Sequence, residues 1–142
     1  MERVVLDPAV LVSALITPQG NPAELWQAVV DQRIGIVTCP LLLAELAVVL
    51  DRPKFRGYAT AEEARAFVAE VARRSHRVPD PSDRPAVSRD PNDDYLFALA
   101  QATAARAVVS GDRDLTDLDD PPVPVLSPAA AVQTLLAGGL SG

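Results

Sequence analysis

Four acidic residues lie beside or within apolar segments, where an acid is unexpected: Asp7, Glu45, Asp94 and Asp112. A carboxylate beside an apolar core costs free energy unless a cation compensates its charge. The chain has a single lysine, Lys54, so lysine cannot supply that compensation at all four places. Clustered oxygen ligands favour a hard divalent metal ion. These acids therefore indicate metal-dependent phosphodiester chemistry.

Glu45 gives the sharpest signal, because it interrupts an apolar helical segment. Its neighbours three and four residues away are all apolar: Leu41, Leu42, Val48 and Val49. This spacing predicts that Glu45 lies on the buried stripe of a helix, where an unpaired carboxylate costs several kcal/mol. A metal-binding or catalytic role follows. The alternatives are a glutamate at the edge of the stripe and a glutamate paired with an arginine.

Asp7 and Asp112 each follow a predicted strand, Val4–Leu6 and Ala107–Ser110 respectively. In open parallel sheets the working site lies off the carboxyl ends of the strands, so both acids should reach the same edge. Asp7 before Pro8 is also a common turn start, and either Asp112 or Asp114 can simply cap a turn.

Asp94 begins an apolar helical pattern and follows two further acids, Asp90 and Asp93. Acids near a helix N-terminus favour the helix dipole and capping, which is enough to explain Asp90 and Asp93. Asp94 lies one position deeper and shares a helix face with Phe97 and Ala98. It is therefore the better candidate ligand.

Two basic segments are candidates for phosphate contact. Their cations are Arg52, Lys54, Arg56, Arg73 and Arg74. Phe55 or Tyr58 would then stack on a base. The alternative is a solvated loop and a solvated helix end.

Short apolar strands alternate with helical patterns along the chain. Strands are predicted at 4–6, 34–38, 107–110 and 123–126. Helices are predicted from a cap at Asn21, over 40–50, from a capping box at Thr60 to about Ser75, over 92–105 and over 128–136. This alternation predicts an α/β three-layer sandwich whose central parallel sheet has four to five strands.

Length and composition fit one domain over residues 1–142, with a flexible tail at 138–142. The net charge of −6 argues against a nucleic-acid coat protein, but not against a nuclease that binds phosphate through metal ions. The single cysteine, Cys39, excludes an internal disulfide. We expect a cytoplasmic protein with no signal peptide and no membrane contact.

The order of these motifs resembles the PIN-domain ribonucleases, and more closely the toxin components of VapC-like toxin–antitoxin pairs. The resemblance rests on four segments in order and covers nearly the whole chain: 4–15, 43–55, 89–95 and 108–115. Each segment alone is weakly specific, whereas four at suitable spacing are fairly specific.

The resemblance implies an endoribonuclease whose acids hold Mg²⁺ or Mn²⁺. Asp7, Glu45 and Asp94 would be ligands, and Asp112 would hold a second metal or orient a water, with Asp114 as the contender for its place. The resemblance also implies an RNA substrate, a small antitoxin partner and a homodimer. Members of the family usually carry a small hydroxyl residue and then asparagine after the first aspartate, where this chain has Pro8 and Ala9.

Two other functions compete with this interpretation. The first is a PIN fold with an impaired site that binds RNA or protein, which Pro8 and Ala9 favour. The second is a phosphoacceptor signalling domain, which also gathers acids at strand ends. That chemistry usually needs a lysine beside the phosphoryl site, and Lys54 lies instead in a loop after the Glu45 helix.

Overall fold

The structure is a computed structural model that describes residues 1–82 and 94–136. Five strands form one sheet in the order β3-β2-β1-β4-β5, and every neighbouring pair is parallel. The strands are β1 (Arg3–Leu6), β2 (Gly35–Thr38), β3 (His76–Arg77), β4 (Val108–Val109) and β5 (Val125–Leu126). The predicted α/β fold with a central parallel sheet is confirmed.

The central strands consist of apolar residues because both faces of the sheet are covered. Val4 and Val5 of β1, and Val108 and Val109 of β4, are fully buried. A strand covered on both faces reads as a continuous apolar run rather than an alternating one. The apolar runs seen in the sequence therefore correspond to the middle of the sheet.

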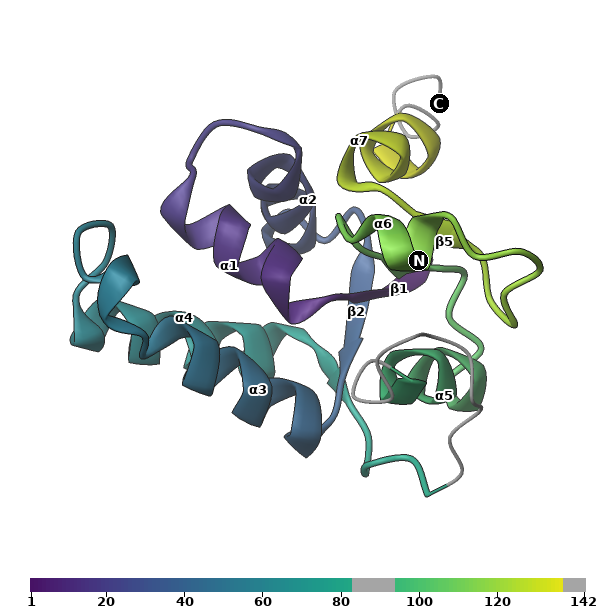
Figure 1. Ribbon diagram of the computed structural model, residues 1–142, viewed down its shortest axis with the longest axis horizontal. Helices are drawn as coiled ribbons and strands as arrows, with labels where there is room; N and C mark the ends of the chain where they lie inside the picture. Colours follow the sequence, from purple (N-terminus) through teal and green to yellow (C-terminus); the bar gives the residue numbers. More distant parts are fainter. Residues whose placement is uncertain (83–93, 137–142) are drawn as a thin grey trace.

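Helices cover both faces. They are α1 (Pro8–Ile16), α2 (Asn21–Val30), α3 (Pro40–Leu50), α4 (Ala61–Arg74), α5 (Asp94–Ala102), α6 (Arg113–Thr116) and α7 (Pro128–Ala131), with a 3₁₀ turn η1 (Pro53–Phe55) and a π-helical segment η3 (Val132–Leu136). Figure 1 shows α1 to α4 together on one side of the sheet and α5 on the other. Right-handed crossovers explain this split, since the chain moves outward from β1 to β3 and then returns to β4.

Several helices begin as the sequence predicts. Pro40 and Pro128 occupy the first positions of α3 and α7, where a missing N–H costs nothing. Thr60 and Glu63 form the predicted capping box at the start of α4. The predicted Asn21 cap is wrong, because Gly20 caps α2 and Asn21 is the first helical residue.

Other boundaries differ from the predicted ones. The predicted helix 92–105 ends at Ala102, since Ala104 adopts a positive φ of 53° that stops the helix, and positions 92 and 93 lie outside the described residues. The two C-terminal strands are shorter than predicted. Three further elements, α1, β3 and α6, were not predicted as elements.

The interior continues between the helices. Leu42, Leu46 and Leu50 form the buried face of α3. Trp26 of α2 packs edge-on against Phe67 of α4, with ring centres 5.2 Å apart. Cys39, between β2 and α3, is completely buried.

Candidate functional site

Asp7 stands at the carboxyl end of β1 and caps α1. Its backbone N–H donates to the Val109 carbonyl across the sheet, which fixes the backbone at this point. Its Oδ1 accepts a hydrogen bond of 3.0 Å from the Ala9 backbone N–H. Pro8 fits between them because the first helical position needs no donor. Asp7 therefore forms the local turn that the turn-former alternative predicted, and its role as a site residue stays a prediction.

Ser110 joins the two acids that follow β1 and β4. Its hydroxyl donates to Asp7 Oδ2 over 2.8 Å and accepts from the Asp112 backbone N–H over 3.0 Å. Ser110 is fully buried, so this bridge is shielded from water. A carboxylate has about four lone-pair sites. Because Asp7 uses one site on each oxygen, both oxygens can still accept a further ligand.

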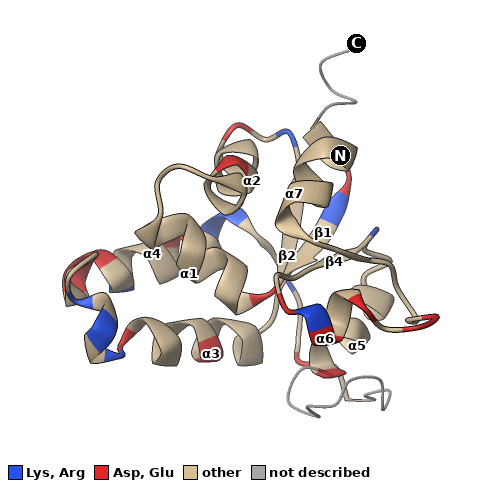
Figure 2. Cartoon of the chain, turned by 45° about the horizontal axis from the view of Figure 1, so that its top comes forward, with Lys and Arg blue, Asp and Glu red and all other residues tan. Residues whose placement is uncertain are grey.

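Asp112 caps α6, as the turn-capping alternative predicted. Its side chain accepts a hydrogen bond of 2.9 Å from the Asp114 backbone N–H. The Asp112 side chain is otherwise exposed. Figure 2 shows the acidic starts of α1 and α6 side by side at the edge of the sheet.

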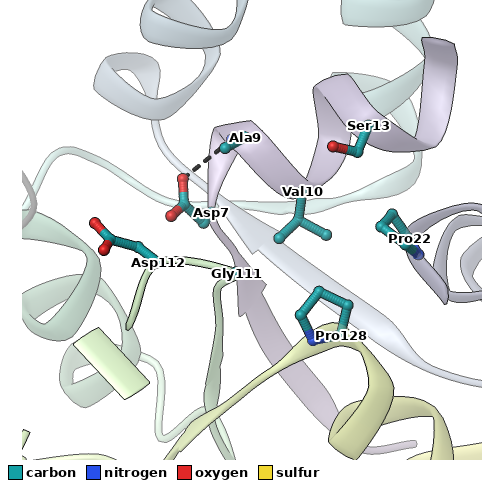
Figure 3. Close-up of a pocket in the computed structure, with 8 residues that line it drawn as sticks. All are labelled: Asp7, Ala9, Val10, Ser13, Pro22, Gly111, Asp112 and Pro128. Carbon is teal, nitrogen blue, oxygen red and sulfur yellow. Dashed lines mark hydrogen bonds between the residues drawn. The ribbon is translucent and has the colours of Figure 1, made fainter. Parts of the chain in front are cut away.

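Asp7 and Asp112 line one pocket of about 410 Å³. Figure 3 shows both carboxylates on one side of this pocket, with Val10, Pro22 and Pro128 opposite. The remaining lining residues are Ala9, Ser13 and Gly111. The pocket therefore pairs an acidic side with an apolar side.

The electrostatics of the pocket oppose ionisation of Asp7. Burial raises the pKa of Asp7 above its ordinary value. Hydrogen bonds from Ala9 and Ser110 lower this pKa, and the negative charge of Asp112 raises it further. The net result is a raised pKa, so the site would gain from a cation that offsets the negative charge.

Glu45 is half-buried rather than fully buried, which corrects the prediction that it lies on the buried stripe of its helix. The buried face of α3 is formed by Leu42, Leu46 and Leu50 instead. Val48, which the helical spacing placed beside Glu45 in the core, is 67% exposed. Glu45 thus lies at the edge of the buried stripe of α3, which is one of the two alternatives given by the sequence.

Tyr95, which sequence reasoning did not single out, lies within electrostatic range of Glu45 and Asp7. Tyr95 is 1% exposed, and burial raises the pKa of its hydroxyl well above the usual range. The negative charge of Glu45 raises this pKa further, followed by Cys39 and Asp7. All three groups therefore lie near the hydroxyl. The available signal was a phenol inside an apolar helix, which needs a polar neighbour.

Asp94 begins α5 and is only 6% exposed, and its greater depth relative to Asp90 and Asp93 stays a prediction. Asp90 and Asp93 lie outside the described residues. Neither Asp94 nor Glu45 lines the pocket of Asp7 and Asp112. Across residues 1–82 and 94–136, no three His, Cys, Asp or Glu side chains lie close enough together to form a metal site. The structure thus brings Asp7 and Asp112 together in one pocket, which Glu45 and Asp94 do not line.

Comparison with known proteins identifies the family. A family profile described as PIN domain matches residues 3–114, which is most of the chain. The chain belongs to the PIN-domain family. An uncharacterized protein of Methanocaldococcus jannaschii is 29% identical over 118 residues, which are 83% of this chain and 76% of the relative.

Solved structures support the same fold. A chain of the Rickettsia felis VapBC2 complex, solved with a DNA fragment from its promoter, matches with a TM-score of 0.61 and 14% identity over 88% of this PIN domain and 98% of that chain. A Pyrobaculum aerophilum protein matches with a TM-score of 0.63 and 17% identity over 96% of this PIN domain and 90% of that chain. Mycobacterium tuberculosis VapC20, described as a sarcin–ricin loop cleaving toxin, matches with a TM-score of 0.56 and 13% identity. The match covers 80% of this PIN domain and 93% of that chain.

The donor chemistry of this PIN domain fits a hard divalent cation. Asp7 and Asp112 offer carboxylate oxygens, which Mg²⁺ and Mn²⁺ prefer to nitrogen or sulfur. The raised pKa of Asp7 shows that its charge is poorly compensated by the protein alone. Asp7 and Asp112 are the acids of this pocket that would hold such an ion, whereas Glu45 and Asp94 do not line it.

The basic residues of this PIN domain are only partly free for phosphate contact. Arg56 donates to the Leu50 and Ala59 carbonyls. Arg74 pairs with Glu70 over 3.2 Å and also donates to the Val30 carbonyl. Both side chains therefore support the fold.

Of the five cations proposed for phosphate contact, the exposed ones lie near the two ends of α4. Arg52 and Lys54 stand at the turn between α3 and α4, where Figure 2 shows basic segments far from the sheet. The ammonium group of Lys54 lies 5.1 Å from the centre of the Phe55 ring, and Tyr58 is 67% exposed. Arg73 is exposed but pairs with Glu70 over 2.6 Å. Among the described contacts, Arg52 and Lys54 thus have fewer ion pairs than the cations at the other end of α4, although they lie far from the pocket of Asp7 and Asp112.

No helix in the described part of this PIN domain is long and apolar enough to cross a membrane.

Proposed function

We propose that this PIN domain is an Mg²⁺- or Mn²⁺-dependent endoribonuclease. The observation that carries the proposal is the pairing of Asp7 and Asp112 in one pocket at the carboxyl edge of a parallel sheet, with Ser110 holding both. Ligand and substrate sites of open α/β sheets lie at that edge. Membership of the PIN-domain family supports the same assignment.

Each acid has a proposed role. Asp7, Glu45 and Asp94 are metal ligands, and Asp112, or Asp114 in its place, holds a second metal or orients the attacking water. A bound divalent ion supplies charge neutralisation at the scissile phosphate and a lowered pKa for the attacking water. Ser110 keeps the Asp7 carboxylate in place, and Ala9 fixes its other oxygen. The apolar wall of Val10 and Pro128 gives the pocket a dry side, where such electrostatic effects are stronger.

RNA is the proposed substrate. The similar fold of VapC20, a sarcin–ricin loop cleaving toxin, supports this class. Arg52 and Lys54 are proposed to contact backbone phosphates, and the exposed Tyr58 ring can stack on a base. Arg56, Arg73 and Arg74 contribute less, because their side chains already bind protein groups.

We further propose that the protein is the toxin of a toxin–antitoxin pair. The similar fold found in the VapBC2 complex supports a small protein partner. Such an antitoxin would inhibit by placing an arginine or lysine in the pocket of Asp7 and Asp112, because a fixed cation replaces the metal charge. A homodimer remains a prediction, which light scattering of the purified protein tests.

The decisive experiment is cleavage of a panel of single-stranded RNAs with Mn²⁺. We compare the wild type with Asp7→Asn and Glu45→Gln, which keep shape and remove one negative charge. Both variants should lose cleavage by two orders of magnitude or more while they remain folded by circular dichroism. Asp119→Asn is the matched control, since Asp119 is an exposed acid outside the pocket. Equal cleavage by all four proteins would point to a contaminating nuclease.

A catalytically impaired binding module is the second candidate, and Ala9 favours it. Ala9 lines the pocket beside Asp7, where its methyl group offers no ligand and no hydrogen bond to a bound water. By the resemblance to PIN-domain ribonucleases, this position usually carries asparagine. If the wild type binds RNA without cleaving it, Ala9→Asn should restore cleavage.

A further inference from the structure

Helix α3 is apolar on nearly every face, although the protein covers only part of it. Between Pro40 and Leu50 the only charged residue is Glu45. Three apolar positions in the middle of the helix are exposed, namely Ala44, Ala47 and Val48, and Val48 is 67% exposed. Ala47 and Val48 lie three and four residues after Ala44, so the three form one stripe. A helix with apolar residues all round is normally covered on all sides, so this stripe indicates a surface that another protein segment covers.

The exposed stripe borders a groove of about 600 Å³ between α3 and α4. Figure 1 shows these two helices side by side and running in opposite directions. Ala47 and Val48 line the groove from α3, and Val68 and four alanines line it from α4. Small side chains at a helix contact allow a short distance between the helix axes. The stripe and the groove together, here called the α3–α4 face, can therefore accept the side of another helix.

The charges along the outer side of α4 indicate which helix fits. The first turn of α4 carries Glu62 and the last turn carries Arg73. These positions are close to three full turns apart, so the two side chains lie on the same side of the helix, separated by about 16 Å. Between them this side carries Ala66 and Ala69, both exposed. An antiparallel helix with the same order of acid, alanines and base complements this pattern, and α4 of a second copy is such a helix.

We propose that the α3–α4 face binds the same face of a second copy of this chain, with the two α4 helices antiparallel. A two-fold axis near the middle of α4 then brings Glu62 opposite the partner subunit's Arg73 at both ends of the contact. Ala66 lies opposite the partner subunit's Ala69 at the centre, where small side chains let the helices approach closely. The proposal rests on the homodimer of the proposed function and does not involve the metal site.

Both charged side chains are available for this contact. Glu62 is exposed and forms no ion pair or side-chain hydrogen bond with any residue of 1–82 and 94–136. The Arg73 side chain is 64% exposed and pairs with Glu70 of its own helix. A guanidinium has five N–H donors, so Arg73 can bind a second carboxylate. Exposed ion pairs add little affinity, so the apolar stripe supplies most of the binding and the charges set the orientation.

Charge reversal at these two positions tests the pairing. Glu62→Arg and Arg73→Glu each place like charges opposite one another at both ends, so each variant alone should dimerise at least about tenfold more weakly than the wild type. In an equimolar mixture the two substitutions compensate each other at both ends, and the heterodimer should form about as tightly as the wild-type dimer. Sedimentation equilibrium gives the dissociation constants, and native mass spectrometry separates the heterodimer from the homodimers.

Two controls separate this contact from general effects. Asp119→Arg and Arg113→Glu make the same changes of net charge at exposed positions of another part of the chain, so their mixture should show no preference for the heterodimer. Val48→Asp should weaken dimerisation at least about tenfold, because it places a charge in the apolar contact. Ala129→Asp, at an exposed position of α7, should not weaken it.

Each contrary result overturns a defined part of the proposal. A dimer that none of the α3 and α4 variants weakens would place the interface elsewhere. Weaker dimers without a heterodimer in the mixture would overturn the antiparallel pairing. A wild type that stays monomeric at high micromolar concentration would overturn this interface together with the homodimer, and would leave the α3–α4 face to a different protein. RNA cleavage by such a monomer would separate this failure from a failure of the proposed nuclease.

Discussion

The Asp7 carboxylate is subject to two opposing effects. As the cap of α1 it gains from being ionised, because a negative charge at a helix N-terminus is favourable. Its burial and the neighbouring charge of Asp112 favour the neutral form. The second effect exceeds the first, since the pKa is raised overall. The ionised Asp7 carboxylate thus lowers the stability of the folded protein. Such destabilising charges are common at functional sites.

Asp7→Asn should raise the melting temperature at pH 7. Because the folded-state pKa of Asp7 lies above its unfolded value, its contribution to stability is fully present below the ordinary aspartate pKa and is lost as the pH rises through the folded pKa. Asparagine carries no charge at any of these pH values. It can still accept from Ala9 and donate to Ser110.

The measurement is thermal unfolding of both proteins from pH 3 to pH 8 without divalent metal. The advantage of Asp7→Asn should be largest at pH 7 and vanish near pH 3. Asp31→Asn, at an exposed acid after α2, controls for the change in net charge. A lower melting temperature for Asp7→Asn at pH 7 would show that the cap outweighs the burial of charge.

Sequence reasoning identified Asp7, Asp94 and Asp112 at element boundaries, but misplaced Glu45. Apolar residues surround α3 on nearly all sides, among them Leu41, Leu43 and Val49, which are only partly buried. When apolar residues occupy every face, helical spacing cannot tell which face is covered. The surroundings of Tyr95 could not be predicted from the sequence either, because they combine residues of α3, α5 and the end of β1.

At the scale of single elements, the capping box of α4 is the clearest local determinant. Thr60 and Glu63 exchange two hydrogen bonds of 3.0 and 2.9 Å. Thr60→Ala should lower the free energy of unfolding by about 1 kcal/mol, because the first turn of α4 loses a partner for a backbone N–H. Urea unfolding measures the change, and Thr17→Ala, at an exposed threonine after α1, should stay close to the wild type. Equal losses in the two variants would show that the box contributes nothing specific.

The elements that sequence reasoning found are those with strong local signals. Proline at a helix start, a capping box and continuous apolar runs each act within a few residues, so α3, α4, β1 and β2 were placed well. The segments β3 and α6 span two and four residues, too few to show any period. They exist because Val37 and Thr38 pair with His76 and Arg77 across the sheet, and because Asp112 caps one turn.

The start of α2 shows how one backbone angle overrides a side-chain preference. Asparagine is a favourable cap, and Asn21 precedes a proline as a cap often does. The turn before α2 requires a φ of 143°, and Gly20 supplies it without steric cost. Gly20 therefore becomes the cap and the helix starts one residue later than the sequence suggested.

For the whole molecule, the proposed metal site makes stability depend on divalent ions. Free Mn²⁺ at 100 times its dissociation constant should add about 2.7 kcal/mol to the free energy of unfolding. That corresponds to a rise of roughly 5–10 °C in melting temperature for a chain of this size. The rise should be smaller at pH 5 than at pH 7, because the ligands must be deprotonated.

Calorimetry across a Mn²⁺ titration checks this expectation. Asp7→Asn and Glu45→Gln should lose most of the stabilisation, and Asp119→Asn should keep it. A melting temperature that does not change with millimolar Mn²⁺ would contradict a metal site of useful affinity.

The overall charge of −6 limits how RNA can be held. If Arg52 and Lys54 contact phosphates, replacing both by glutamine should weaken RNA binding and reduce the slope of log affinity against log salt by about 1.4, or about 0.7 for each contact. Fluorescence anisotropy of a labelled RNA between 50 and 200 mM salt measures the slope. Arg106→Gln removes an exposed cation that pairs with Glu2 and should leave the slope unchanged. An unchanged slope in the double variant would place the RNA elsewhere.

The burial of Cys39 also gives the protein a built-in reporter of its own unfolding. Its thiol is completely buried between β2 and α3, and burial raises its pKa to about 11. At pH 7 roughly one molecule in ten thousand then carries the reactive thiolate. Alkylating agents should therefore react only when the chain opens around this junction. Because no second cysteine competes, the labelling rate of this one sulfur atom measures how often the junction of β2 and α3 is exposed.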